Sequence, residues 1–592
     1  MTVSREGTSV TEKDPSPLHA FKQEAATALA RASGLDAGMV LELLQAPPRA
    51  DMGDLAFPCF ALAKERKTAP PVIAKEIAAA FSATTLPAGV ATVQPAGPYV
   101  NLTLDRDLVT RTILDHVLSR GQAYGDQDIG RGKPVVIDYS SPNVAKPFGI
   151  GHLRSTVIGA AIVRILRALG HEVFGINHLG DWGTQFGKMM VACQKWGTPG
   201  PDDPDPVKTT FELYVRFHQE AESDPSLEEE GRAWFARLEQ GDAEARRYWD
   251  LLTEIGKKEF ARIYDKLGIR FEHFTGESFY NDKLDETVDV LRKKGLLTTS
   301  QEAQIVDLSA WDMPPALMKK ADDSSLYLTR DLAALFYRYE TFRFHRALYV
   351  VGMEQTLHFR QLFKVAELLG LEWAKGCEHV PFGLIRFKDG KMSTRKGKVI
   401  FLEEVLDRAV EMVRGIIAEK NPDLENKDEV AREVGIGAIV FNDLKHRRVK
   451  DVQFDWSEIL NFDGKTGPYL QYSHARIGSI LRKAGEEPPA RVPEGASLSL
   501  QEEWDLTLRL ADLPSVLRAA GNEAEPSLVS TYILDLAEVF NRYYNLGGKD
   551  PALRVLCEDP DVRQARLCLV RAVETVLKKG LSLLGVGTPE KM

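Results

Sequence analysis

The sequence predicts an α/β protein: a doubly wound, Rossmann-like parallel sheet with a helical insertion, an N-terminal α+β domain and a C-terminal all-α helical bundle. Three observations lead to this fold class. The runs VVIDYSS (135–141) and HEVFGIN (171–177) flank a glycine loop and a long apolar helix, which is the unit that begins a parallel sheet. Behind the breaker-rich linker 197–208, residues 209–270 are strongly helical and charged. From residue 402 onward almost everything has helical periodicity.

The remaining elements follow from local periodicity. Helical spacing over 18–32 and 71–81 and a strand pattern over 99–104 predict the N-terminal unit. Strand patterns return at ALYVVG (347–352) and VPFGLIRF (380–387). A chain of 592 residues is long enough for about four units of roughly 150 residues. We therefore expect a loosely ordered N-terminus (1–16), an N-terminal domain (17–120), a Rossmann domain (121–400, insertion at about 195–320), a helical region (401–465) and a C-terminal helical domain (466–592).

Composition excludes several classes of protein. With 75 Lys and Arg against 85 Asp and Glu, the net charge is −10, so only a local basic face could bind nucleic acid. No stretch approaches the ~18–20 apolar residues of a membrane span, and the polar first residues lack the apolar core of a secretory signal. The five cysteines form no CxxC pair, which argues against a zinc site and a disulfide framework. We expect a cytoplasmic protein with no membrane partner.

The loop FGIGHLRST (148–156) lies between the first strand and its helix. Gly149 and Gly151 lack a Cβ, so a ligand can approach their backbone closely. The helix N-terminus behind them offers free N–H groups and a positive dipole end for phosphate, and His152 can donate a hydrogen bond there. The alternative is an ordinary turn before a helix, since neither the GxxxxGK[ST] nor the GxGxxG pattern is complete.

The loop KDGKMSTRKGK (388–398) combines five basic residues with two glycines and two hydroxyls. Lysines such as Lys391, with the hydroxyl of Ser393 beside it, can neutralise a triphosphate or a leaving pyrophosphate. A solvated basic loop is the alternative that this segment alone leaves open.

Together, the two loops resemble the HIGH and KMSK motifs of class I aminoacyl-tRNA synthetases, as GIGH (149–152) and KMST (391–394). The wider sequence, from roughly residue 45 to the end, is similar to the arginyl-tRNA synthetases. The segments that carry this resemblance are SSPNVAKPFGIGHLRST (140–156), NHLGDWGTQFG (177–187), YLTRD (327–331), YVVGMEQ (349–355) and TGPYLQYSHARI (466–477). Two positions depart from the pattern: Gly149 replaces the first histidine and Thr394 the second lysine. In that family a lysine before the first motif commonly compensates for the missing lysine, and Lys146 stands there.

The resemblance implies an arginine–tRNA ligase that uses ATP, with Mg²⁺ accompanying the ATP and no metal held by the protein. It assigns catalysis to Lys146, His152 and Lys391, and ATP binding to Gly149, Gly151, His152, Lys391 and Ser393. It assigns arginine binding to Asp138, Ser141, Asn143, Tyr327, Asp331 and Gln355. A guanidinium is a planar fork of donors that carboxylates meet best. Asp331 suits it as an acceptor, and Tyr327 lies one helical turn away.

The expected partners are tRNA(Arg), L-arginine and ATP, bound by a monomer. The resemblance places anticodon contacts near YLQY, on Tyr469, Tyr472 and Arg476, because exposed aromatic side chains can stack on unpaired bases. It matches residues 17–120 to a domain that touches the tRNA elbow. The basic run KHRRVK (445–450), on an expected helix, could track phosphates of the acceptor stem or form a solvated face.

Two other functions remain open at this point. One is a class I synthetase for a different amino acid, although cysteine is disfavoured because the chain shows no zinc cluster. The other is a non-catalytic RNA-binding protein that kept the fold, which the departures at Gly149 and Thr394 would suit.

Overall fold

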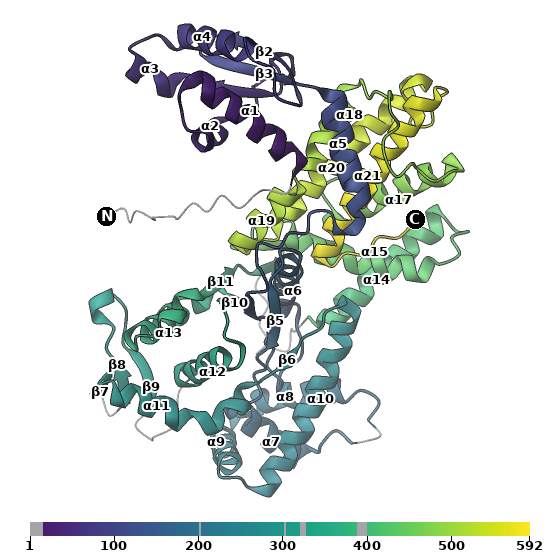
Figure 1. Cartoon of the computed structure of the whole chain (residues 1–592). Coiled ribbons are helices and arrows are strands. Elements are labelled where there is room, and N and C mark those ends of the chain that lie inside the picture. The colour runs from purple at the N-terminus through teal and green to yellow at the C-terminus, as the bar shows by residue number, and fades with distance from the viewer. Residues whose placement is uncertain (1–15, 201–202, 301–302, 320–326, 388–399) are drawn as a thin grey trace.

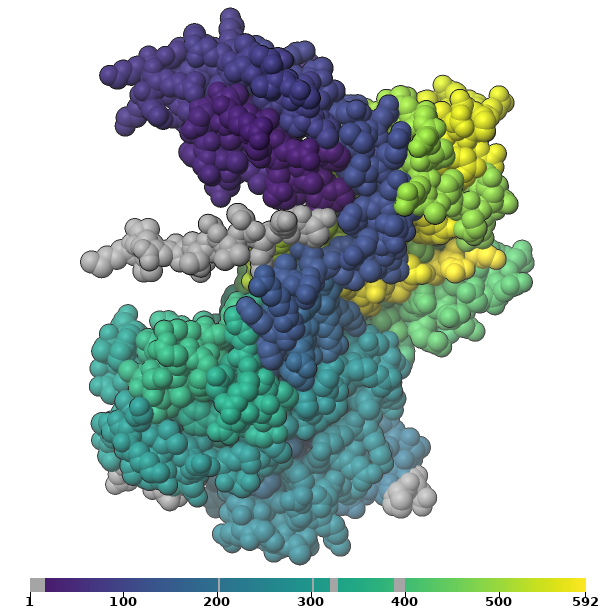
Figure 2. Space-filling view, viewed as in Figure 1, coloured from purple at the N-terminus to yellow at the C-terminus, as the bar shows by residue number. Residues whose placement is uncertain are grey.

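The computed structural model describes residues 16–200, 203–300, 303–319, 327–387 and 400–592. Figure 1 shows an N-terminal unit at the top, a helical bundle at the right, and the parallel sheet with its insertion below. In the space-filling view of Figure 2, the N-terminal unit projects from the rest of the molecule. No helix in these described ranges combines the length and the apolar character needed to cross a membrane.

The N-terminal unit contains an antiparallel sheet in the order β1-β3-β2. Its strands are β1 (Leu55–Pro58), β2 (Val90–Ala96) and β3 (Tyr99–Leu104). Helix α4 (Pro70–Ser82) packs on this sheet and α1 (Pro17–Ser33) packs on α4. The helices expected over 18–32 and 71–81 and the strand over 99–104 are thereby confirmed. Two short helices complete the unit, α2 (Ala37–Leu43) and α3 (Phe60–Arg66).

A five-stranded parallel sheet in the order β11-β10-β4-β5-β6 organises the middle of the chain. Its strands are β4 (Pro134–Asp138), β5 (Glu172–Asn177), β6 (His273–Phe274), β10 (Arg346–Gly352) and β11 (Cys377–Phe382). The chain runs outward from β4 through β5 to β6 and returns on the other side of β4 as β10. The boundary between β4 and β10 is therefore the switch point of the sheet, outside which ligands of such folds bind.

The loop after β4 leads into the expected long helix. A 3₁₀ turn, η3 (Ile150–His152), comes first, and α6 (Leu153–Ala168) follows before Gly170 turns the chain with φ +81°. The α6 helix crosses from β4 to β5. The sequence predicted one continuous helix here, and the structure divides it at Leu153.

The insertion begins with four helices and continues with a small antiparallel sheet. The expected helical region 209–270 is confirmed. The sheet β7-β8-β9 was not predicted, because each of its strands is only four residues long. The elements are α7 (Thr184–Trp196), α8 (Pro206–Ser223), α9 (Ser226–Glu239), α10 (Ala243–Leu267), η4 (Glu277–Lys283), α11 (Leu284–Lys293), β7 (Leu297–Ser300), β8 (Ala303–Val306) and β9 (Ala316–Lys319). Helix α12 (Tyr327–Phe342) returns the chain to β10, and α13 (Thr356–Leu368) joins β10 to β11.

The C-terminal part is helical, as predicted, apart from β13 (Val452–Phe454), which pairs in parallel with β12 (Ile385–Phe387). Its helices are α14 (Leu402–Lys420), α15 (Lys427–Leu444), α16 (Trp456–Ile459), α17 (Gly467–Ala484), α18 (Gln501–Ala511), α19 (Leu513–Glu523), α20 (Ser527–Lys549) and α21 (Pro560–Leu584). Helix α5 (Arg106–Arg120), which leaves the N-terminal unit, packs against α18 and α21 (Figure 1). The remaining 3₁₀ turns are η1 (Ala50–Met52), η2 (Gly121–Ala123), η5 (Ser309–Trp311), η6 (Met353–Gln355), η7 (Glu372–Gly376) and η9 (Pro551–Leu553).

The prediction that KHRRVK (445–450) is helical is wrong. Helix α15 ends at Leu444, and the basic run forms turns after it. Arg448 donates hydrogen bonds to the carbonyl oxygens of Pro381 (2.9 Å) and Ala524 (3.2 Å). This arginine therefore connects the end of β11 to the bundle and is not a free phosphate contact.

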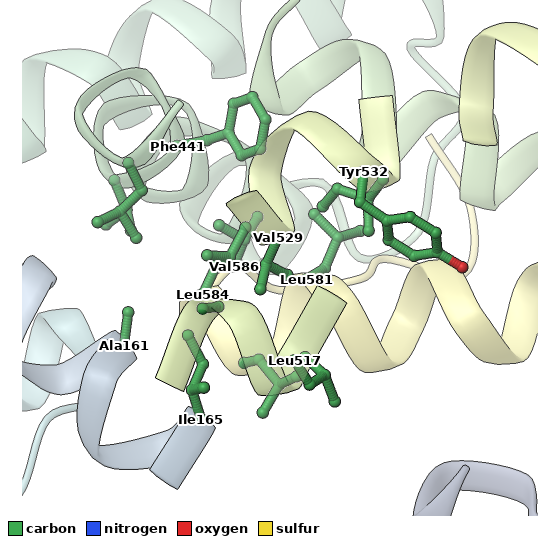
Figure 3. Close-up of a cluster of buried hydrophobic side chains, with 14 of the residues drawn as sticks. Ala161, Ile165, Phe441, Leu517, Val529, Tyr532, Leu581, Leu584 and Val586 are labelled. Carbon is green, nitrogen blue, oxygen red and sulfur yellow. The ribbon is translucent and has the colours of Figure 1, made fainter. Parts of the chain in front are cut away.

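The sheet and the bundle share one hydrophobic core. Figure 3 shows Ala161 and Ile165 of α6 in the same cluster as Leu517 of α19 and Leu584 of α21. All four side chains are buried. Because α6 starts at the loop after β4, this packing fixes the axis of the helix whose N-terminus faces the sheet edge.

Candidate active site

A pocket opens at the carboxyl edge of the sheet, beside the switch point between β4 and β10. It is bounded by the loop after β4, the start of α6, the ends of β5 and β10, and one side of α12 and α13. The polar residues that line it are Asp138, Ser140, Ser141, His152, Ser155, His178, Glu277, Asp331, Tyr349, Gln355 and His358, with Gly151 among the others. Of the predicted site residues, the structure thus brings together Asp138, Ser141, Gly151, His152, Asp331 and Gln355.

The loop after β4 has a strained backbone. Ser140 and Ser141 adopt φ values of +71° and +47°, in the left-handed region that costs roughly 1–2 kcal/mol for a residue with a Cβ. Hydrogen bonds hold them there. The Ser140 amide donates to Ser155 Oγ (2.9 Å), whose hydroxyl donates to the Val350 carbonyl (2.6 Å), and Ser140 Oγ lies 2.7 Å from the Tyr264 hydroxyl. Strain kept in place by such a network is typical of functional sites.

Asp138 ends β4, as predicted, but its carboxylate is already engaged. Arg338 of α12 forms an ion pair with it, with Nη2 2.7 Å from Oδ2, and Ser141 Oγ donates to Oδ1 at 2.7 Å. Both charged side chains are buried. A buried charge requires such a partner, so Asp138 has little remaining capacity to bind a second cation.

Asp331, on α12, also lines the pocket and lies between two histidines. His358 Nε2 is 2.6 Å from Asp331 Oδ2, and His178 Nε2 is 3.9 Å from Oδ1. His178 Nδ1 lies 3.0 Å from the Thr275 carbonyl, and burial lowers the pKa of this histidine. The ring of His178 is therefore neutral near pH 7 and does not form a charged pair with Asp331.

Glu277 is a pocket residue that the sequence analysis missed. Its pKa is raised to about 7, chiefly by burial; the charge of Arg330 lowers it, and the carboxylates of Asp331 and Asp181 contribute to the rise. Asp181 positions this segment by accepting from the Ser278 amide and hydroxyl, both at 2.8 Å. The only signal in the sequence was an acid following the two-residue strand β6, which is too short to predict.

Gly276 allows the segment that carries Glu277 to lie close to Asp181. A Cβ on Gly276 would lie 2.4 Å from Asp181 Oδ2, so glycine is required for the contact that places Glu277. With Asp331, the pocket therefore has two carboxyl groups that are not committed to an internal arginine. Such a pair is suited to a planar cation with several donors.

His152 stands at the start of α6. Its Nδ1 is 3.2 Å from the Gly149 carbonyl, and burial lowers its pKa to about 4, helped by the positive charge of Lys146. The ring is therefore neutral near pH 7, with its proton on Nδ1. To donate from Nε2 to a phosphate oxygen, His152 must gain a proton, which an approaching polyanion favours.

The loop 148–152 is held from both sides. The Ile150 amide donates to the Ile400 carbonyl (3.0 Å), and the Leu402 amide donates to the Phe148 carbonyl (2.9 Å). On the opposite side, Glu259 of α10 accepts from the Phe148 amide (3.0 Å). The chain directly after 388–399 is thus bonded to the loop that carries His152.

The other predicted residues lie at the margin of the pocket or outside the residues that the structure describes. Gly149 pairs with Phe401, and Asn143 Oδ1 accepts from the Ala145 amide (3.0 Å). Lys146 lines a small neighbouring cavity together with Glu259. Tyr327 begins α12, but its side chain lies outside the described residues, as do Lys391 and Ser393.

The residues predicted to bind RNA lie far from this pocket, on α17. Tyr472 is 42% exposed, and the Arg476 guanidinium lies 4.8 Å from its ring centroid and 5.0 Å from that of Tyr544. Tyr469 is half-buried, and its hydroxyl accepts from Asn541 Nδ2 (2.9 Å). Of the two predicted tyrosines, Tyr472 is the exposed one. Tyr544 was missed, because it comes from α20 and meets α17 only in the fold.

These residues line a groove between α17, α20 and the C-terminus. Its walls include Asn426, Tyr472, Arg476, Arg482, Tyr544 and Lys591. Aromatic faces next to cationic side chains are the combination that binds unpaired bases and their phosphates.

Comparisons with known families match three segments of the chain. Residues 113–456 match "tRNA synthetases class I (R), catalytic domain". Residues 470–592 match "DALR anticodon binding domain", and residues 19–104 match "Arginyl tRNA synthetase N terminal domain".

Individual relatives agree over nearly the full length. An arginine–tRNA ligase of Exiguobacterium sibiricum is 50% identical over 575 residues, covering 97% of this chain and 100% of the relative. One from Halothermothrix orenii is 46% identical over 550 residues, covering 93% and 95%. Among solved structures, the arginyl-tRNA synthetase of Thermus thermophilus superposes with a TM-score of 0.80 at 28% identity, covering 96% of this chain and 100% of that one. That of Plasmodium falciparum shares the fold, with a TM-score of 0.77 at 22% identity and coverages of 97% and 98%.

Proposed function

The chain belongs to the arginyl-tRNA synthetases of class I, and from this premise we propose that the pocket at the sheet edge activates arginine with ATP for transfer to tRNA(Arg). The protein is an arginine–tRNA ligase. The observation that carries the assignment of the site is the position of Asp331 and Glu277 in a pocket that also contains the start of α6. One end of this pocket suits a guanidinium and the other suits a phosphate.

Arginine is held by its side chain at the acidic end. Asp331 and Glu277 accept from the guanidinium, and Gln355 and Ser141 contact the remainder of the amino acid. Asp138 acts indirectly, because Arg338 occupies its carboxylate. Lysine would leave part of this acceptor set unpaired, which can discriminate by ~10⁴-fold or more.

ATP is bound at the other end, at the loop 148–152. The amides at the start of α6 and a protonated His152 contact the phosphates, and Lys146, Lys391 and Ser393 hold the departing pyrophosphate. Magnesium enters with ATP and is held mostly by phosphate oxygens. The arginine carboxylate attacks the α-phosphorus and the bond to pyrophosphate breaks. A ribose hydroxyl of tRNA then attacks the adenylate carbonyl, which forms the ester and releases AMP. Positioning and charge stabilisation supply the rate enhancement.

The groove at Tyr472, Arg476 and Tyr544 binds the anticodon loop. Its exposed ring and two flanking cation–π contacts suit stacking on unpaired bases. The protein acts as a monomer in the cytoplasm in this proposal.

The test is arginine-dependent exchange of pyrophosphate into ATP, with and without tRNA(Arg). We expect exchange only with tRNA present, and none when lysine replaces arginine. Exchange without tRNA would support the proposed activity but contradict the coupling between the groove and the pocket. Absence of both exchange and aminoacylation would contradict the proposed function.

A further inference from the structure

Helix α10 (Ala243–Leu267) supports the loop after β4 at several points. Its Gly256 lies against Val144, where a Cβ would be 2.6 Å from Val144 Cγ1. Farther along the helix, Glu259 accepts from the Phe148 amide (3.0 Å), and the Tyr264 hydroxyl lies 2.7 Å from Ser140 Oγ. An inserted helix therefore contacts the backbone or side chains of the loop that forms the pocket.

Glu259 is the unusual member of this set. Its side chain is only 5% exposed and its carboxyl lies in a largely apolar cavity wall. Burial raises its pKa to about 7, with the Phe148 amide and Arg262 opposing this shift and Glu403 and Asp205 adding to it. Burying a carboxyl group is unfavourable, so a side chain with a purely packing role at this position would be expected to be apolar.

Phe148 transmits this contact to the catalytic loop. Its ring centroid lies 5.1 Å from that of His152, and 5.4 Å and 5.7 Å from those of Phe260 and Tyr264 on α10. The amide of Phe148 and its ring are thus both held by the same helix. A shift of Phe148 would displace the ring of His152 directly.

Helix α10 is itself anchored to the segment that follows 388–399. Arg262 forms an ion pair with Glu403, and Lys266 pairs with Glu403 (2.8 Å) and Asp407 (2.6 Å). The adjacent Leu402 amide donates to the Phe148 carbonyl. Phe148 is therefore held through its amide by α10 and through its carbonyl by the start of α14.

We propose that Glu259 is a positioning residue for adenylate formation, which fixes the loop 148–152 by accepting the hydrogen bond of the Phe148 amide. This inference rests on the proposed binding of ATP at that loop. The role requires a hydrogen-bond acceptor at this place, and a negative charge is not needed. Glutamine, which has the same length and an acceptor oxygen, should therefore replace it.

The experiment compares Glu259→Met with Glu259→Gln in the full-length protein. Pyrophosphate exchange is measured with tRNA(Arg) present, varying ATP and arginine separately. We expect Glu259→Met to lower kcat/KM for ATP by about 10–100-fold, the range for a misplaced catalytic group, with the KM for arginine within about twofold. Glu259→Gln should stay within about threefold of the unsubstituted protein for both substrates.

Glu254→Met is the matched control. It makes the same change on the same helix at an exposed position, where the glutamate pairs with Lys258 four residues on. Glu254→Met should leave the kinetic constants for both ATP and arginine unchanged. Thermal unfolding of all three variants shows whether they remain folded.

Three results would overturn the proposal. Glu259→Met could match the unsubstituted protein, Glu259→Gln could be as impaired as Glu259→Met, or the constants for ATP and arginine could change together. The variants are compared only if the unsubstituted protein catalyses pyrophosphate exchange. If it does not, the proposed function fails, and this failure is distinct from failure of the role proposed for Glu259.

Discussion

Arg338 places its guanidinium 2.7 Å from the carboxylate of Asp138, which lines the pocket proposed to bind arginine. The ion pair is fully enclosed, and the Arg338 guanidinium also lies 5.3 Å from the ring centroid of Tyr349. The protein thus keeps one arginine of its own next to the site of the substrate. In the proposed function, this ion pair leaves Asp331 and Glu277 as the acceptors for the substrate guanidinium.

Removing one member of that pair should be more harmful than removing both. Arg338→Met leaves the Asp138 carboxylate buried and unpaired, and we expect a loss of about 3–5 kcal/mol in stability. Adding Asp138→Asn should recover a substantial part of this loss. Urea unfolding of the single and double variants measures both effects, and equal midpoints for the two would contradict the buried-charge explanation.

Asp331→Asn should weaken arginine use selectively. The substitution removes the charge that a guanidinium would meet but keeps the shape of the side chain, so we expect the KM for arginine to rise by ~10–100-fold. The KM for ATP should change by less than about twofold, because His152 and the loop 148–152 lie at the other end of the pocket. Steady-state exchange kinetics check this, and equal damage to both substrates would point to a different arginine site.

Arginine binding should release a proton near neutral pH. Burial raises the pKa of Glu277 to about 7, and the neighbouring carboxylates of Asp331 and Asp181 contribute to this rise. A bound guanidinium favours the ionised carboxylate and lowers that pKa, so arginine affinity should increase as the pH rises from about 6 to 8. Calorimetry in two buffers of different ionisation enthalpy measures the release. In Glu277→Gln the pH dependence should disappear, and a dependence that persists there would assign the proton to another group.

Lys146→Ala should lower the rate of arginine activation by ~10²–10³, the usual effect of losing one charge-stabilising donor. The motivation is Thr394, which stands where the second lysine of KMSK is expected, together with the electrostatic influence of Lys146 on His152. Single-turnover formation of the adenylate is the appropriate measurement. A loss below about threefold would remove Lys146 from the mechanism.

Tyr472→Ala should raise the KM for tRNA(Arg) and leave the KM values for arginine and ATP unchanged. Stacking of a base on an aromatic ring is worth about 1–3 kcal/mol, so the KM for tRNA(Arg) should rise by roughly 5-fold or more. Tyr469→Phe removes a hydroxyl that is bonded to Asn541 within the protein and should have a smaller effect on tRNA. Aminoacylation kinetics that rank the two variants in the opposite order would exclude the stacking role of Tyr472.

Local periodicity determined much of the fold. The runs at β4 and β5 and the apolar helix between them have patterns that allow few other structures, and α8, α9 and α10 follow from the charged helical stretch behind the linker. The strands β7, β8 and β9 have no such pattern, because each is only four residues long. The run 445–450 was expected on a helix, whereas it forms turns after α15, and Arg447 and Arg448 contact distant segments.

For the site, the sequence by itself singled out the loop 148–156 and Asp331 as candidates, and residues of both line the pocket at the sheet edge. Those residues belong to continuous motifs whose local geometry depends on neighbours a few positions away. Only the tertiary structure decided that Asp138 is paired with Arg338, that Glu277 enters the pocket, and that Glu259 holds Phe148 from 111 positions along the chain. Burial and partner choice depend on which distant segments are packed together, and no local pattern contains that information.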